Sequence, residues 1–135
     1  MPHRYFVRLK DAESLAKRLG ATLSGGETLA LVGPLGSGKT TFTKALAKTL
    51  HIHQSVVSPT FILMSRYHGW ANVQGKKKPI WLYHLDLYRT KDLAEVKALG
   101  LSEVWSDPSA IVAIEWADKI KALLPKNTIT IKFSR

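Results

Sequence analysis

A glycine-rich loop at residues 33–40 has the residue types and spacing that point most directly to chemistry. It reads Gly-Pro-Leu-Gly-Ser-Gly-Lys-Thr and fits the pattern G-x-x-x-x-G-K-[ST] at every fixed position. Glycines let the backbone curl until its amide groups point inward, and the start of the following helix adds further amides that attract an anion. Lys39 would add a positive charge, and the hydroxyl of Thr40 could bind Mg²⁺. We therefore expect phosphate groups to contact the loop and the helix start, at Gly33, Leu35, Gly36, Ser37, Gly38, Lys39, Thr40 and Thr41.

Two carboxylates stand where a metal beside such a loop would need them. Glu115 follows five apolar residues in "AIVAIE", and a buried carboxylate is costly unless it meets a cation or a hydrogen-bond donor. Asp86 lies in the strand-like run "WLYHLDLYR". Alternation puts its side chain on the same side as those of Leu82, His84 and Tyr88, and we expect that side not to be buried in a core. The alternatives are that Glu115 only marks the end of a strand and that Asp86 lies on an outer strand wetted on one side.

Ser58 and Thr60 flank a proline between the loop helix and the next strands. A threonine placed there can sense the γ-phosphate and Mg²⁺ in proteins that switch with their nucleotide, whereas Ser-Pro also favours an ordinary turn. Trp116 directly follows Glu115 and could stack on a base. For the other tryptophans the expectation is packing in the core or at an interface: Trp70, Trp81 and Trp105.

The rest of the sequence predicts the elements that position these residues. Apolar runs predict strands at 5–9, 28–32, 60–67, 79–89, 109–118 and 128–133. Helical periodicity predicts helices at 11–23 (capped by Asp11), 40–50 and 91–101. A polar connection at 70–78 would join two strands of an antiparallel hairpin. Strands interleaved with helices indicate one α/β domain with a mixed, mostly parallel sheet.

Charge is distributed unevenly along the chain. The net charge is +10, from 20 basic and 10 acidic residues, and no acidic residue lies between Glu27 and Asp86. This half should carry a positive field that attracts a nucleotide, an RNA backbone or an acidic protein surface, unless the charge serves only solubility. The chain has no cysteine and no run of 18 apolar residues, so we expect no disulfide, no thiolate metal site and no membrane span.

Four stretches, in this order, resemble one family. They are "GPLGSGKTT", "SPTF", "HLDLYR" and "IEW", and together they look like the bacterial tRNA threonylcarbamoyladenosine biosynthesis ATPase family, TsaE, over residues 11–125. The loop is shared by many families, whereas the H-x-D-x-Y-R run followed by an apolar strand ending in Glu-Trp is far more specific. The resemblance implies one cytoplasmic P-loop ATPase domain over residues 1–135, with the three-layer sandwich of P-loop NTPases.

The resemblance also implies ATP and Mg²⁺ as cofactors. It implies two partners that form a dimer, one of which is the threonylcarbamoyl transferase that modifies adenosine 37 of tRNA. Members of the family hydrolyse ATP weakly when alone, and hydrolysis is thought to reset the complex between turnovers. This protein would contact the tRNA indirectly through its partners, or directly through its own basic face.

Site roles carry over by matching positions. Lys39 and Thr40 carry over as phosphate and Mg²⁺ ligands, Glu115 as the Walker B acid, and Asp86 as the essential acid near the metal and the γ-phosphate. Trp116 carries over as a neighbour of the nucleotide site and Thr60 as part of a switch-like element, while structural and partner-facing roles both stay open for Tyr88 and Arg89. The family usually has an acid after the first glycine of the loop, where this chain has Pro34.

Other functions remain as alternatives to weak, partner-modulated ATP hydrolysis. A small-molecule kinase of the P-loop class needs an arginine-bearing lid, and Arg66 and Arg89 are the only central arginines. A nucleotide-gated module would grip tRNA itself, with Lys76–Lys78 as an RNA contact or a solvated turn. A GTPase is disfavoured because the guanine-reading N/T-K-x-D element is absent. In the ATPase, either Asp86 or Glu115 would orient the attacking water.

Overall fold

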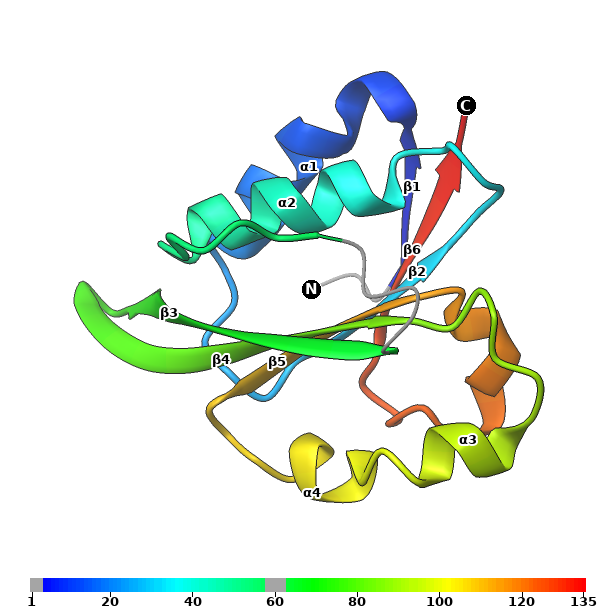
Figure 1. Cartoon of the computed structure of the whole chain (residues 1–135). Coiled ribbons are helices and arrows are strands. Elements are labelled where there is room, and N and C mark those ends of the chain that lie inside the picture. Colours follow the sequence, from blue (N-terminus) through cyan, green and yellow to red (C-terminus); the bar gives the residue numbers. More distant parts are fainter. Residues whose placement is uncertain (1–3, 58–62) are drawn as a thin grey trace.

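The computed structural model describes residues 4–57 and 63–135 and is built around one sheet (Figure 1). Its six strands lie in the order β1-β6-β2-β5-β4-β3. They are β1 (Arg4–Arg8), β2 (Thr28–Val32), β3 (Met64–Val73), β4 (Lys76–Asp86), β5 (Ala110–Glu115) and β6 (Ile129–Ser134). The two central strands, β2 and β5, have the sequences TLALV and AIVAIE. They are almost wholly apolar because a central parallel strand is covered on both faces.

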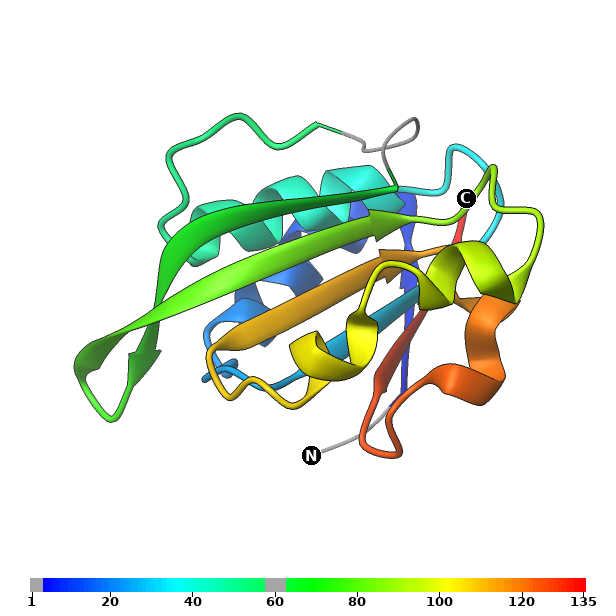
Figure 2. The ribbon, with the colours of Figure 1, turned by 60° about the horizontal axis from the view of Figure 1, so that its bottom comes forward.

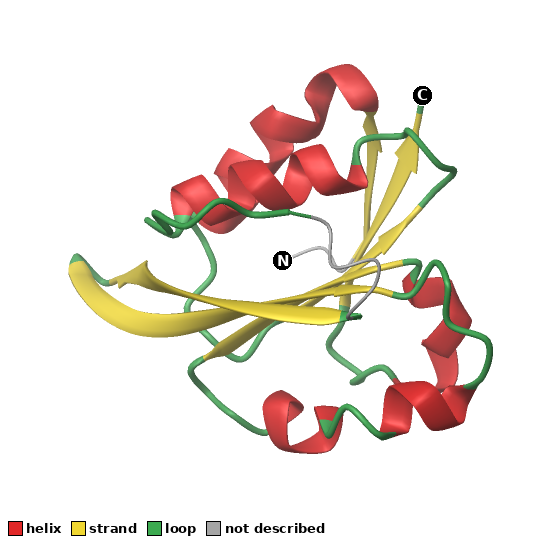
Figure 3. Ribbon diagram, viewed as in Figure 1, coloured by secondary structure: helices red, strands yellow, loops and turns green. Residues whose placement is uncertain are grey.

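Helices cover both faces of the sheet, so the structure has three layers with the sheet in the middle, as Figure 3 shows. On one face lie α1 (Ala12–Gly20), which follows the 3-10 turn η1 (Leu9–Asp11), and α2 (Lys39–Thr49). On the other face lie α3 (Leu93–Lys97), α4 (Leu101–Trp105) and the 3-10 helix η2 (Ala117–Leu123). Alternate strand residues feed two separate apolar clusters: Leu29 and Leu31 face α2, while Ala30 faces η2 and α3. The expected α/β sandwich is confirmed.

The sheet is mixed, as predicted. Neighbouring strands run parallel from β1 through β6, β2 and β5 to β4, and only β3 and β4 pair antiparallel in the described structure. Because these parallel strands end at the same edge, the loop after β2 and the last residues of β4 and β5 are brought together there. This edge is where the candidate site forms.

The prediction of a polar connection at 70–78 is wrong. Strand pairing continues from Met64 opposite Leu85 to Val73 opposite Lys76, so the hairpin is longer than expected and its turn is short. The turn residues Gln74 and Gly75 have φ of 52° and 79°, as a two-residue hairpin turn of the primed type requires. Figure 2 shows the hairpin reaching beyond the other strands. The polar residues suggested a loop, but they belong to the end of a hairpin that reaches beyond the neighbouring strands and is therefore exposed to solvent on its outer side.

The expectation that one side of the Asp86 strand would stay out of a core is also wrong. Leu82, His84 and Asp86 are all buried, whereas Tyr88, beyond the strand end, is exposed. The reason is the position of β4, which lies between β5 and β3 rather than at the edge of the sheet. Its polar side chains therefore lie between the sheet and α2 and must find partners inside the protein.

Helix boundaries differ in two places from the predictions. The helix predicted at 11–23 is shorter, and the side chain of Asp11 makes no capping hydrogen bond because this residue belongs to the preceding 3-10 turn. The helix predicted at 91–101 is interrupted by Gly100, which has a φ of 71° and separates α3 from α4. In the described parts of the chain, none of the helices has the length and apolar character needed to cross a bilayer.

Gly69 marks the closest approach between the hairpin and the chain that follows α2. A Cβ at this position would press on the Leu50 carbonyl oxygen and lie 2.7 Å from the Ile52 side chain. The same carbonyl accepts a 2.7 Å hydrogen bond from the backbone amide of Trp70, so it cannot easily move away.

We predict that Gly69→Ala lowers the free energy of unfolding by about 1–3 kcal/mol, because the extra methyl overpacks this crossing. The measurement is urea unfolding followed by circular dichroism. Gly75→Asn is the matched control: nothing lies within 4 Å of the position, and asparagine tolerates the left-handed backbone of the turn. Equal stability of Gly69→Ala and the parent would contradict the proposed close packing.

Candidate functional site

The glycine-rich loop joins the end of β2 to the start of α2. Gly38 precedes the helix with a φ of 104°, and a Cβ there would lie 2.9 Å from the side chain of Leu9. Both the backbone angle and the contact therefore require glycine. Phe42 is the first residue to donate an intrahelical hydrogen bond, to the carbonyl of Gly38 at 2.8 Å. The amides of the first turn consequently have no partner within the helix and face the edge where the strands end.

Lys39 is held inside the loop by the loop's own backbone. Its Nζ donates to the carbonyl oxygens of Gly33 at 2.6 Å and Pro34 at 3.0 Å, and lies 4.2 Å from the centre of the Trp116 ring. Only 5% of the residue is exposed. Burial lowers the pKa of Lys39 from its ordinary value, and the nearby charges of Glu115 and Asp86 oppose that shift.

Glu115 ends β5 as a buried, hydrogen-bonded carboxylate. The residue is 4% exposed. The hydroxyl of Thr40, in the first turn of α2, donates to the carboxylate and lies 3.1 Å from each oxygen. Nε2 of His84, on β4, lies 2.6 Å from Oε2. Glu115 is therefore not a solvent-exposed strand end: it links three elements at one point.

Asp86 lies beside Glu115 on the neighbouring strand. The two residues are direct partners in the parallel β4–β5 register. Oδ1 of Asp86 accepts a 3.0 Å hydrogen bond from the backbone amide of Tyr88, so the chain turns around its carboxylate as it leaves the sheet. Asp86 is not on a wetted outer strand, because it is 5% exposed and β3 lies on the far side of β4. The fold thus brings both predicted acids to one edge.

Trp116 has an unusual backbone conformation. Its φ is 61°, in the left-handed region that non-glycine residues seldom adopt. The tight turn directs the ring between Lys39 and Tyr88, whose ring centre lies 5.1 Å away. Positive φ at a bulky residue tends to persist where a site requires it. The ring lies at the predicted site and contacts the loop lysine.

A cavity of about 380 Å³ opens among these groups. Its lining includes most of the residues predicted from the sequence: Leu35, Gly36, Gly38, Lys39, Thr40, Thr41, Asp86, Glu115 and Trp116. Gly33 and Ser37 do not line it. The Gly33 carbonyl instead accepts from Lys39, and Ser37 is buried in the loop. Ser58 and Thr60 lie outside the described residues.

Sequence reasoning missed several residues of the site. His84 appears in the sequence analysis within a strand pattern and as the first residue of the H-x-D-x-Y-R run, but no role is assigned to it there, although its pairing with Glu115 is among the shortest polar contacts of the site. Tyr88 and Arg89 line the cavity. The sequence signal that could have indicated them is their position in the H-x-D-x-Y-R run, directly after Asp86. Leu9 lines it as well, and no local signal indicates this because Leu9 follows the first strand and meets the loop only through folding.

The donor set suits a metal that is shared with a ligand. In the described regions, no three His, Asp or Glu side chains gather into a self-sufficient metal site. Mg²⁺ commonly keeps several waters and is bound through one or two carboxylates together with substrate phosphates. The Thr40 hydroxyl with Glu115, and Asp86 on the next strand, form a partial set of this kind beside the loop.

A glycine-rich loop between a central strand and a helix, at the edge where parallel strands end, defines a P-loop α/β protein. The sequence model of the family described as threonylcarbamoyl adenosine biosynthesis protein TsaE matches residues 7–135, and the chain belongs to that family.

Similar proteins agree with this assignment. A tRNA threonylcarbamoyladenosine biosynthesis protein TsaE of Bacillus subtilis is 36% identical over 96% of this chain and 75% of its own length. The corresponding protein of Nostoc is 42% identical over 84% of this chain and 68% of its own. The crystal structure of Bacillus subtilis YdiB superposes with a TM-score of 0.59 at 32% identity, over 89% of this chain and 67% of that one.

We predict that His84→Leu lowers the free energy of unfolding by about 3 kcal/mol, because it leaves the Glu115 carboxylate buried without one of its partners. Adding Glu115→Gln removes the buried charge. The double variant should therefore recover at least about 1 kcal/mol relative to the sum of the two single effects. Urea unfolding of the parent, both single variants and the double variant measures this coupling. Strict additivity would show that the two side chains do not interact.

Proposed function

We propose that this protein is a P-loop ATPase that binds and slowly hydrolyses ATP in support of threonylcarbamoyladenosine modification of tRNA. The observation that supports it best is the convergence of Lys39, the Thr40–Glu115 pair and Asp86 around one cavity beside a helix N-terminus. Membership in the TsaE family supports the proposed role in threonylcarbamoyladenosine biosynthesis. ATP rather than GTP is proposed because the chain lacks the guanine-reading N/T-K-x-D sequence.

Lys39 and the loop amides would hold the phosphate tail. In the structure the ammonium group occupies the cradle itself and donates to the carbonyls of Gly33 and Pro34. A phosphate oxygen would replace those carbonyls as the partner of the ammonium group. Its negative charge would stabilise the protonated form of Lys39, whose pKa is lowered by burial. Trp116 would form one wall of the site and limit where the lysine can move.

Thr40 and Glu115 would form the protein side of a magnesium site. A bound Mg²⁺ would neutralise charge that develops on the phosphates. His84 would fix the orientation of the Glu115 carboxylate from behind, as partners of metal-binding carboxylates commonly do.

Asp86 lines the same cavity from the neighbouring strand, and we propose that it orients the attacking water while Glu115 contributes to the metal site. With catalysis resting on positioning and electrostatics, we propose that the rate of the protein alone is low, as the family resemblance implies. We propose that it rises when the protein meets a transferase and that transferase's dimer partner.

The test is ATP turnover by the purified protein, with and without this partner pair. We predict that Asp86→Ala reduces partner-stimulated turnover by about 10²-fold or more, because water is no longer positioned, while ATP still binds. Glu103→Ala, on the exposed surface of α4, removes the same charge far from the cavity and should leave turnover unchanged. Unchanged turnover in Asp86→Ala would remove this residue from the mechanism.

We also predict that affinity for ATP falls as the pH rises toward the ordinary lysine pKa of about 10.4, and that the fall begins at a lower pH than an ordinary lysine would cause. The empty site loses the Lys39 proton early because burial lowers its pKa, whereas the bound phosphates retain the proton. Binding therefore takes up a proton in this window, which calorimetry in buffers of different ionisation enthalpy can count. Lys39→Arg stays charged, so its affinity, although weaker, should be flat over the same range. A parallel decline in that variant would assign the effect elsewhere.

A further inference from the structure

The outer face of the β3–β4 hairpin carries a row of aromatic and cationic side chains. We define this face by Arg66, His68, Trp70, Trp81 and Lys77, with Lys76 beside it at the turn. Strand alternation separates them from the inner side, where Tyr67 and Leu82 are buried. The register sets Arg66 opposite Tyr83, His68 opposite Trp81, and Trp70 opposite Pro79.

These side chains are stacked against one another instead of being covered by a helix. The Arg66 guanidinium lies 4.5 Å from the centre of the Trp81 ring. The His68 ring lies edge-on to Trp81 at 5.1 Å and to Trp70 at 5.6 Å between ring centres. Trp70 remains 37% exposed, so of the two expectations for it, core and interface, packing in the core is wrong. A large aromatic side chain held at the surface among cations is a feature of binding faces.

The face carries positive charge without local neutralisation. No acidic residue lies between Glu27 and Asp86 in the sequence, so the β3–β4 hairpin has no acidic side chain before its last residue, Asp86. Within the described residues, none of its cations lies within ion-pair distance of a carboxylate. Lys78 differs from its neighbours because it donates to the carbonyls of Ser24 and Pro108 and so fastens the arm to the rest of the domain. Lys76 and Lys77 extend into solvent.

We propose that this outer hairpin face binds single-stranded RNA. Bases would stack on the exposed ring of Trp70 and on the Arg66–Trp81 pair, and phosphates would meet Lys76 and Lys77. Aromatic side chains and guanidinium planes on a sheet are the usual platform for unstacked bases, and the positive charge suits the backbone. An acidic protein surface would use the charges but would leave the rings without a role. Duplex RNA would hide its bases from them.

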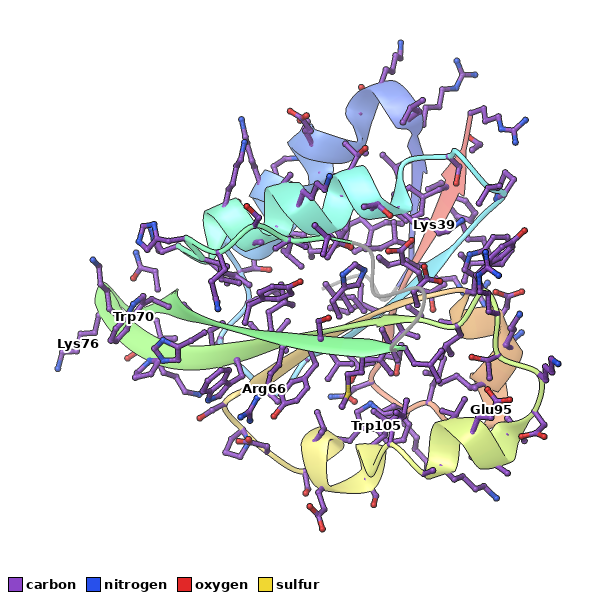
Figure 4. All side chains as sticks on the ribbon, in the orientation of Figure 1. Lys39, Arg66, Trp70, Lys76, Glu95 and Trp105 are labelled. Carbon is purple, nitrogen blue, oxygen red and sulfur yellow. The ribbon has the colours of Figure 1, made fainter. Side chains whose placement is uncertain are left out.

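This site is separate from the cavity of the proposed ATPase. Figure 4 shows Trp70 and Lys76 near the far end of the hairpin, well away from Lys39. The proposal does not rest on ATP hydrolysis. Turnover of the hairpin variants should equal that of the parent, and RNA binding should be measurable even if no turnover is found.

The experiment measures fluorescence anisotropy of a labelled single-stranded RNA of mixed sequence, titrated with the full chain at several salt concentrations. The chain should bind the single strand at least about tenfold more tightly than the blunt duplex of the same sequence. Trp70→Ala should weaken binding by about 5- to 100-fold, and Trp70→Phe should restore most of the affinity because a stacking ring remains. Thermal denaturation checks that both variants are folded.

Lys76→Ala/Lys77→Ala tests the phosphate contacts at two exposed positions at the start of β4, next to the hairpin turn. It should reduce the slope of log affinity against log salt by about 1.4, since each single-strand phosphate contact contributes about 0.7. Lys10→Ala/Lys17→Ala removes the same charge from exposed positions on η1 and α1 and should leave the slope unchanged.

Four results would each overturn the proposal. They are no binding of the single strand by the parent, equal binding of the duplex, an equal loss of affinity in the Lys10/Lys17 control, and competition by poly-glutamate as strong as by unlabelled RNA. The last would assign the face to an acidic protein partner.

Discussion

The site depends on one buried carboxylate. Glu115 ends a central strand with almost no solvent contact, a position that is unfavourable for a charge unless donors surround it. Thr40 supplies one donor from the first turn of α2, and His84 lies at hydrogen-bonding distance from the neighbouring strand. Satisfying this one group fixes where the helix begins relative to β4 and β5. The glycine-rich loop, which lies between β2 and that helix, is then held at the edge of the sheet.

The same constraint shapes the cavity. With α2 held over the end of β5, Lys39 falls between the loop carbonyls and the ring of Trp116, and Asp86 takes the adjacent register position. The left-handed turn at Trp116 is tolerated because its ring is held between Lys39 and Tyr88. In this arrangement the loop's own carbonyls satisfy the Lys39 ammonium group, a role that an anion in the cavity would take over under the proposed function.

The sequence located residues of the candidate site where the signal is local. The loop and the acid at the end of an apolar run are encoded within a few consecutive residues, so the sequence alone places Lys39, Thr40 and Glu115. It does not place His84, because the role of that residue depends on Glu115, 31 residues further along the chain. The burial of β4 was misjudged for a related reason, since the polar pattern around Asp86 suits a wetted edge as well as a polar network beneath a helix. The choice between these two environments depends on the strand order. Because β3 pairs with the far side of β4, β4 is not the edge strand, and its polar side chains His84 and Asp86 are buried.

Strand β4 belongs to both regions of interest, and its pairing shows how they are separated. From Trp81 to Asp86 it pairs with β5 and is fixed in the sheet, whereas between Lys76 and Ile80 it pairs with β3 alone in the described structure. This arm keeps its shape through the packing of Gly69 against the chain after α2 and through the backbone contacts of Lys78. Coupling between distant sites requires an element with two alternative arrangements, and the structure shows a single register for β4. The cavity and the hairpin face therefore lie on two differently held parts of one strand, at separate places on the sheet.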